Sequence, residues 1–212
     1  MSMRDSDRLI IEDGDADTAA IAAYEASRRD AVRRGLAAAG AVIGAALVPA
    51  LLSVRDAFAA APQNDAGILT SAIRLENTAV AAYAAAVNNR VLTAPFRRTA
   101  ALFGRQEAEH AAALTAALKS LGGTPPAGTD AKLLAPLTGA KSQAQVARFA
   151  IELETMAVAA YYDASKKLQQ ARLLQTSAQI MSNEGQHLVV LRQTLGRSPV
   201  PNAFENGKAS KK

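Results

Sequence analysis

The chain of 212 residues contains no cysteine and no tryptophan, and only 4% of its residues are aromatic. Without cysteine there can be no disulfide, no zinc–thiolate site and no iron–sulfur cluster. Any metal ion would therefore be held by carboxylate oxygens and imidazole nitrogens. Hydrophobic residues make up 50% of the chain, which is enough for one domain with a full core.

Positive charge exceeds negative charge in the part of the chain that is expected to fold. The whole chain has a formal net charge of +5, and from Ala60 onward 17 Lys+Arg stand against 10 Asp+Glu, which gives 17 − 10 = +7. These basic residues are scattered, and no aromatic side chains interleave with them. We interpret the surface as solvated and expect no nucleic-acid partner.

Residues 1–59 have the pattern of an export signal. Two arginine pairs, the second at Arg33-Arg34, precede an uncharged run from Gly35 to Val54, and an A-x-A site ends at Ala59. This order is typical of a cleaved secretory signal, and the paired arginines resemble those of twin-arginine signals. Because Ala and Gly dominate the run, we expect export to the periplasm by the twin-arginine machinery. The alternative is an uncleaved signal that anchors the protein in the membrane.

The chain contains an internal repeat. The segment LENTAVAAY, which begins at Leu75, recurs as LETMAVAAY from Leu153, at an offset of 153 − 75 = 78. The segment EAEH, which begins at Glu107, matches EGQH from Glu184, at an offset of 184 − 107 = 77. These two offsets indicate a duplicated pair of helices.

Four segments combine helix-forming residues with helical apolar spacing: 65–90, 95–120, 143–167 and 171–195. Short links must join antiparallel neighbours, whereas residues 121–141, with three prolines and four glycines, can run the length of a bundle. We therefore predict an all-α antiparallel four-helix bundle over residues 60–200, with one long crossover between its second and third helices. The remaining tail, 201–212, is basic and expected to be disordered.

Several residues at the predicted helix ends support these limits. The candidate N-caps are Asn64 or Asp65, Thr93 and Ser142, and the candidate C-terminal glycines are Gly122, Gly123 and Gly196. Ser142 with Gln145 also forms a capping-box pattern. The fourth helix has no equally clear cap.

Both histidines of the chain occupy the fourth position of a Glu-x-x-His motif. Residues i and i+3 of a helix point the same way, so Glu107 and His110 could share one metal ion. Glu184 and His187 repeat this spacing in the second half of the chain. Chance is a poor explanation for both histidines standing in the same motif.

One further glutamate in each half completes the candidate site. Glu76 and Glu154 precede their motifs by similar intervals, 107 − 76 = 31 and 184 − 154 = 30. Antiparallel packing would bring them to mid-bundle, where four buried carboxylates need metal ions or protons to compensate their repulsion. The predicted metal ligands are Glu76, Glu107, His110, Glu154, Glu184 and His187.

Two tyrosines stand two helical turns after the glutamates of the first and third helices. Tyr83 follows Glu76, and Tyr161 follows Glu154, by seven residues each. The favoured interpretation is a pair of core tyrosines with satisfied hydroxyls. The alternative is that they donate hydrogen bonds to the metal ligands or serve as radical sites. No catalytic residue is assigned.

One carboxylate from each of two helices, with Glu-x-x-His from each of the other two, is a pattern of dinuclear carboxylate bundles. Over residues 64–196 the chain resembles the ferritin-like superfamily, which includes bacterioferritins and rubrerythrins. Mixed carboxylate and imidazole ligation suits two ions of iron, with manganese as the alternative. The resemblance implies a dinuclear oxidoreductase that oxidises Fe(II) with O₂ or peroxide, and the signal pattern of residues 1–59 indicates that it is exported.

Three other functions stay open. Storage of iron in a hollow homo-oligomeric cage needs an acidic interior, but only 10 − 4 = 6 acidic residues after Ala59 are not assigned as ligands. A metal-free stress-protection or interaction bundle of the cell envelope predicts that Glu154→Gln barely alters stability or metal content. A manganese site would indicate catalase-like disproportionation of peroxide.

Overall fold

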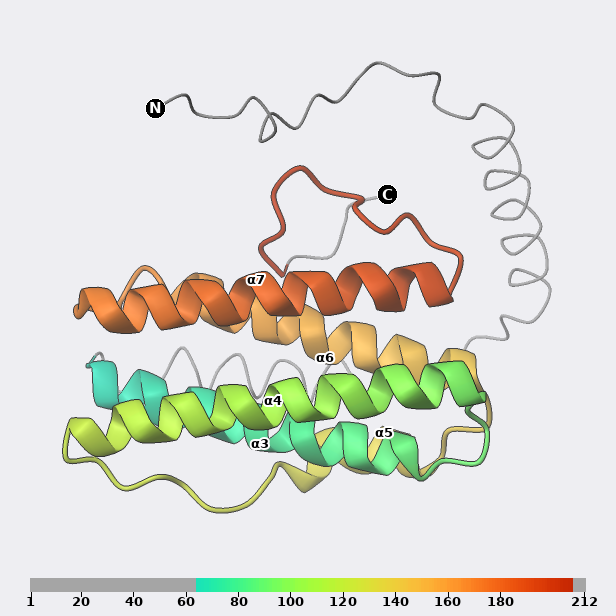
Figure 1. Ribbon diagram of the computed structural model, residues 1–212, viewed down its shortest axis with the longest axis horizontal. Helices are drawn as coiled ribbons and strands as arrows, with labels where there is room; N and C mark the ends of the chain where they lie inside the picture. Colours follow the sequence, from blue (N-terminus) through green and yellow to red (C-terminus); the bar gives the residue numbers. More distant parts are fainter. Residues whose placement is uncertain (1–63, 208–212) are drawn as a thin grey trace, which may run out of the picture. The chain divides into compact units, whose positions relative to one another are not determined.

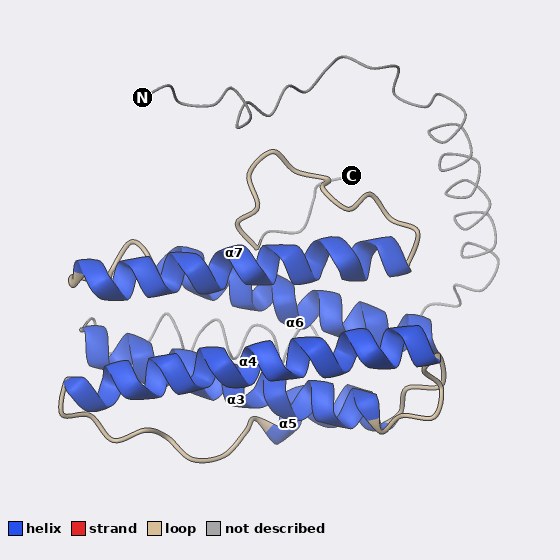
Figure 2. Cartoon of the chain, viewed as in Figure 1, coloured by secondary structure: helices blue, strands red, loops and turns tan. Residues whose placement is uncertain are grey.

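A computed structural model describes residues 64–207, which form five helices and no strand (Figure 2). The four long helices are α3 (Asp65–Val87), α4 (Ala94–Ser120), α6 (Gln143–Ala164) and α7 (Ala171–Thr194). The short helix is α5 (Ala131–Thr138). The all-α class and the four long helices predicted from the sequence are confirmed.

The long helices pack as two antiparallel hairpins (Figure 1). α3 lies against α4, and α6 lies against α7, each pair being joined by a short loop. The crossover, residues 121–142, runs back along the bundle, so that α6 begins near the end of α3. This is the single long connection predicted for a ferritin-like bundle.

The crossover is not the plain link that its prolines and glycines predicted, because it contains α5. Asp130 caps this helix by accepting hydrogen bonds from the backbone of the first turn. Leu133 and Leu137 are buried, and α5 packs on α3 and α6. The backbone N–H of Asp130 also donates to Thr78 Oγ1 on α3 at 3.0 Å. The spacing of the two leucines was the available sequence signal, and Pro136 concealed it.

The predicted N-cap residues lie at the helix starts, but one of them, Thr93, does not make a capping hydrogen bond. Asn64 and Ser142 accept hydrogen bonds from the first turns of α3 and α6. Thr93 occupies the N-cap position of α4 but makes no capping bond, and its hydroxyl donates to Gln143 Oε1 instead. Gly122 and Gly196 have positive φ angles of 76° and 65° at the ends of α4 and α7.

The start of α7 has no capping side chain, but the two residues before this helix are bonded to another helix. Asp65, in the first turn of α3, is buried, and its two carboxylate oxygens accept hydrogen bonds from the backbone N–H groups of Gln169 and Gln170 at 2.9 and 3.2 Å. The two hairpins are therefore tied together where α3 begins and α7 begins. A bond between residues 104 positions apart leaves no local sequence pattern.

The segment after α7 folds back over the second hairpin as far as it is described. Glu205 pairs with Arg192 at 2.8 Å. Gly207 has φ +70° and approaches α6 so closely that an added Cβ would lie 2.4 Å from the backbone of Thr155 and Ala159. Residues 201–207 belong to the tail that was expected to be disordered, and they make these contacts because Glu205 finds a partly buried basic partner and glycine allows the close approach.

The expected export signal and the alternative membrane anchor fall within residues 1–63, outside the described part of the chain. Residues 208–212 are outside it as well. Among the helices between residues 64 and 207, none is long and apolar enough to span a membrane.

Candidate metal centre

The structure brings all six predicted ligands together in the interior of the bundle. They come from all four long helices: Glu76 from α3, Glu107 and His110 from α4, Glu154 from α6, and Glu184 and His187 from α7. The four glutamates and His187 are at most 1% exposed, and the side chain of His110 is 13% exposed. The core of apolar residues around them excludes water from five of the six side chains.

The six side chains form two overlapping groups, and in each group the ligand atoms lie within 4.8 Å of one another. One group contains Glu76, Glu107, His110 and Glu184, and the other contains Glu107, Glu154, Glu184 and His187. Glu107 and Glu184 belong to both groups. The cluster therefore has two positions, each of which could hold a metal ion, with two carboxylates placed to bridge them.

The bridging carboxylates divide their oxygens between the two histidines. Oε2 of Glu107 lies 3.3 Å from Nδ1 of His110, while Oε1 lies 3.1 Å from Nδ1 of His187. Glu184 repeats this division, with Oε1 at 3.0 Å from His110 Nδ1 and Oε2 at 3.1 Å from His187 Nδ1. Nδ1 of each ring thus faces the centre of the cluster.

The remaining glutamates each approach one histidine only. Glu76 Oε2 lies 3.7 Å from His110 Nδ1, and Glu154 Oε1 lies 3.3 Å from His187 Nδ1. These two carboxylates stand at opposite ends of the cluster. Each position therefore has one histidine and one terminal carboxylate of its own, as well as the two shared carboxylates.

Several ligand atoms are buried without a hydrogen bond. They are Glu107 Oε1, both carboxylate oxygens of Glu184 and His187 Nδ1. They lie close to one another, but none of them forms a hydrogen bond of acceptable geometry. Buried polar atoms are rarely left unpaired in native proteins, so this arrangement fits metal ions better than it fits an internal hydrogen-bond network.

The two tyrosines bind the terminal carboxylates across the hairpins. The buried hydroxyl of Tyr83 on α3 donates to Glu154 on α6, and the buried hydroxyl of Tyr161 on α6 donates to Glu76 on α3. Both tyrosines lie in the core with satisfied hydroxyls, and because their acceptors are two of the predicted ligands, the contacts are those of the alternative in which the tyrosines donate to the ligands. The sequence did not indicate that each tyrosine binds the carboxylate of the opposite hairpin.

Two residues that sequence reasoning missed support His187. Gln106 Oε1 lies 2.9 Å from Nε2 of His187, and the ring of Phe103 stacks on the imidazole with centroids 3.9 Å apart. Both come from α4, whereas His187 lies on α7. No spacing within one helix could have revealed a contact between two hairpins.

The histidines carry protons in the metal-free site. Burial by itself lowers the pKa of His110, but contacts with Glu107, Glu184 and Glu76 outweigh it and raise the pKa to about 12. Burial likewise lowers the pKa of His187, and its three glutamate neighbours raise it to about 11. Two imidazolium cations therefore stand among the four carboxylates when no metal is bound.

The pKa values of the four carboxylates shift in two directions. Burial tends to raise the pKa of Glu184, but His110 and His187 lower it to about 2, and the pKa of Glu107 is lowered in the same way. Burial dominates at Glu76 and Glu154 and raises both pKa values well above the usual range. Glu107 and Glu184 thus offset the charge of the two imidazolium rings, and bound metal ions would displace the protons.

A family model for the ferritin-like domain matches residues 64–197. The chain belongs to the ferritin-like family. No curated protein and no solved structure matches it. The match covers all four long helices and every member of the acidic and histidine cluster, so the resemblance drawn from the repeat and the Glu-x-x-His motifs is confirmed at the level of the family.

Proposed function

We propose that this ferritin-like bundle binds two metal ions, most simply iron, and oxidises Fe(II) with O₂ or peroxide. The observation that supports this proposal best is the pair of four-residue groups that share Glu107 and Glu184. Two ions held by groups that share Glu107 and Glu184 would lie close enough to act on one oxidant molecule. The four carboxylates would balance the charge of two divalent ions.

The donor set favours iron or manganese over other metals. It consists of carboxylate oxygens and imidazole nitrogens, and the chain has no thiolate to offer. An iron pair supplies two electrons to O₂ or peroxide. The protein's own contribution is to hold the carboxylates near one another without water, so that their repulsion is relieved only when cations or protons are present.

The surrounding residues keep the ligands in place. Tyr161 donates to Oε1 of Glu76, whose Oε2 faces His110. Tyr83 donates to Oε1 of Glu154, the oxygen that also lies 3.3 Å from His187 Nδ1. Gln106 Oε1 accepts a hydrogen bond from Nε2 of His187 and keeps Nδ1 directed at the cluster. Protons displaced from the cluster on metal binding must pass to solvent, and His110 is the most exposed of the six ligands.

Export by the twin-arginine route is part of the same proposal and rests on residues 1–59 alone. That route carries folded proteins, so the metal ions could be loaded before export. Cell fractionation followed by N-terminal sequencing tests it. A periplasmic protein that begins just after Ala59 supports the proposal, and an intact chain in the membrane fraction supports the anchor instead.

The reaction is tested with two neighbouring glutamates of α4. Glu107 is buried in the cluster, whereas Glu109 is exposed, so Glu107→Gln and Glu109→Gln make the same chemical change inside and outside the site. After Fe(II) is added to metal-free protein, we expect O₂ or peroxide consumption by the wild type and by Glu109→Gln. Glu107→Gln should consume little. No iron-dependent consumption by the wild type would reject the reaction.

A further inference from the structure

The two halves of the site are alike in their ligands but not in their surroundings. The offset of 77 residues that relates His110 to His187 also relates Phe103 to Ile180 and Gln106 to Asn183. The following inference rests on the proposed metal site and concerns the difference between its two positions.

The position at His187 is fully supported. Its imidazole is 1% exposed, Gln106 binds Nε2 at 2.9 Å, and Phe103 stacks on the ring. A hydrogen bond from the outer ring nitrogen fixes both the orientation of the imidazole and the proton on Nε2, so that Nδ1 is left as the ligand atom. Little rotational freedom remains to be lost when an ion binds.

The position at His110 lacks both supports. Asn183 stands where the repeat would place a partner for this histidine, but its side chain is one methylene shorter than that of glutamine. Asn183 Oδ1 is buried and makes no hydrogen bond. Ile180 replaces the aromatic ring, and the side chain of His110 is 13% exposed. This imidazole is therefore both less restrained and closer to solvent.

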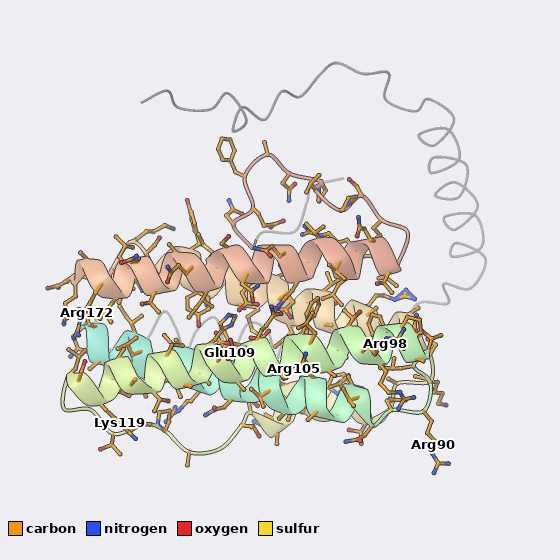
Figure 3. The ribbon with its side chains drawn as sticks, in the orientation of Figure 1. Arg90, Arg98, Arg105, Glu109, Lys119 and Arg172 are labelled. Carbon is orange, nitrogen blue, oxygen red and sulfur yellow. The ribbon has the colours of Figure 1, made fainter. Side chains whose placement is uncertain are left out.

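Exposed charged residues accompany His110 along α4. Arg105 and Glu109 are exposed, and Glu109 directly precedes His110 in the chain. Figure 3 labels both residues, together with Arg98, along this helix.

We propose that the two metal positions are unequal. The position at His187 holds its ion tightly, whereas the position at His110 binds its ion more weakly, exchanges it with solvent and is the one that Fe(II) and the oxidant reach. Gln106 is the positioning residue that creates the difference, and the shorter Asn183 is the reason that the second half lacks it.

Titration of metal-free protein with Co(II) tests this inference without using activity. Visible absorption and competition with a chelator give a dissociation constant for each ion, and elemental analysis gives the number of ions. We expect two Co(II) ions per chain with dissociation constants at least about tenfold apart, since losing an outer partner of a metal-bound histidine typically lowers affinity about 10- to 100-fold.

Changing Gln106 to Asn and Asn183 to Gln shows which of the two metal positions holds the tighter ion. Gln106→Asn should weaken the tighter ion about tenfold or more and leave the weaker ion unchanged, whereas Asn183→Gln should strengthen the weaker ion. Gln179→Asn makes the same change at an exposed site on α7 and should alter neither ion. Thermal unfolding followed by circular dichroism confirms that each variant is folded.

The outcomes separate the inference from the proposed function. Two Co(II) ions with indistinguishable affinities, or a Gln106→Asn variant that behaves like Gln179→Asn, would overturn the inequality and leave the dinuclear site intact. A wild-type protein that binds no Co(II) would reject both.

Discussion

The hydroxyl of Tyr83 on α3 donates a hydrogen bond to Glu154 on α6, 71 residues along the chain. The repeat provides the reciprocal bond, in which Tyr161 on α6 donates to Glu76 on α3. Each hairpin thus restrains a carboxylate of the other. These bonds join the two hairpins at the same carboxylates that flank the cluster, so stability and the geometry of the site depend on the same contacts.

Removing either tyrosine hydroxyl should destabilise the bundle. Tyr83→Phe and Tyr161→Phe leave a fully buried carboxylate without its donor, and we expect each to lower the free energy of unfolding by about 1–3 kcal/mol. Tyr162→Phe is the matched control, because Tyr162 is 37% exposed. Urea unfolding of the metal-free proteins measures the three changes. Equal effects at Tyr161 and Tyr162 would contradict the importance of the buried hydrogen bond.

The metal-free protein should lose stability as the pH rises. His110 and His187 have folded-state pKa values of about 12 and 11, and unfolding returns them to about 6.5. Above pH 6.5 the folded state therefore holds protons that the unfolded state releases. Each histidine can lower the free energy of unfolding by up to about 1.4 kcal/mol per pH unit as the pH rises from about 6.5 toward the folded pKa.

The carboxylates modify this pH dependence in opposite directions. The raised pKa values of Glu76 and Glu154 add to the loss of stability above pH 4.5, whereas the stability due to Glu184 is present above pH 4.5 and is lost as the pH falls toward about 2. Urea titrations at pH 6.5, 7.5 and 8.5 measure the slope. Metal-loaded protein should lack it, since bound ions displace the protons, and a flat profile for the metal-free protein would contradict the charge assignment.

Two helical glycines should respond in opposite ways to alanine. A Cβ at Gly185, on α7, would meet nothing within 4 Å, so Gly185→Ala should stabilise the protein by about 0.5–1 kcal/mol through helix propensity. A Cβ at Gly104, on α4, would lie 3.1 Å from the Cβ of Tyr83. Gly104→Ala should therefore be destabilising despite the same gain in propensity. Thermal unfolding measures both, and a stabilising Gly104→Ala would show that Tyr83 can move without cost.

The sequence was sufficient for the helices and for the gathering of the six polar residues, because both depend on local spacing and on the repeat. Helical periodicity gave α3, α4, α6 and α7 to within a few residues of their ends. The spacing of Glu107 and His110 placed one motif on one face of α4, and the same spacing of Glu184 and His187 placed the other on one face of α7. Antiparallel packing within each hairpin was then enough to predict that the glutamate of its first helix meets the motif of its second.

Contacts between distant elements could not be predicted in this way. The bond between His187 and Gln106, the bond from the backbone of Gln169 to Asp65 and the bonds from each tyrosine to the glutamate of the other half all join residues on different hairpins. Their existence depends on the rotation of each helix about its own axis, which periodicity does not fix to within one side chain. Asn183 illustrates the same limit of prediction, since its side chain is one methylene shorter than that of Gln106 and makes no contact with His110 like the one between Gln106 and His187.

The most direct test of the dinuclear site is the metal content of the purified protein, measured by elemental analysis after loading with Fe(II) under anaerobic conditions. Two variants should be measured beside the wild type. Glu154→Gln alters a buried carboxylate of the cluster, and Glu109→Gln alters an exposed carboxylate outside it. We expect two irons per chain in the wild type and in Glu109→Gln, and fewer in Glu154→Gln. Wild-type protein that retains neither iron nor manganese, with a Glu154→Gln variant of unchanged metal content and stability, would contradict the metal site and support a metal-free bundle.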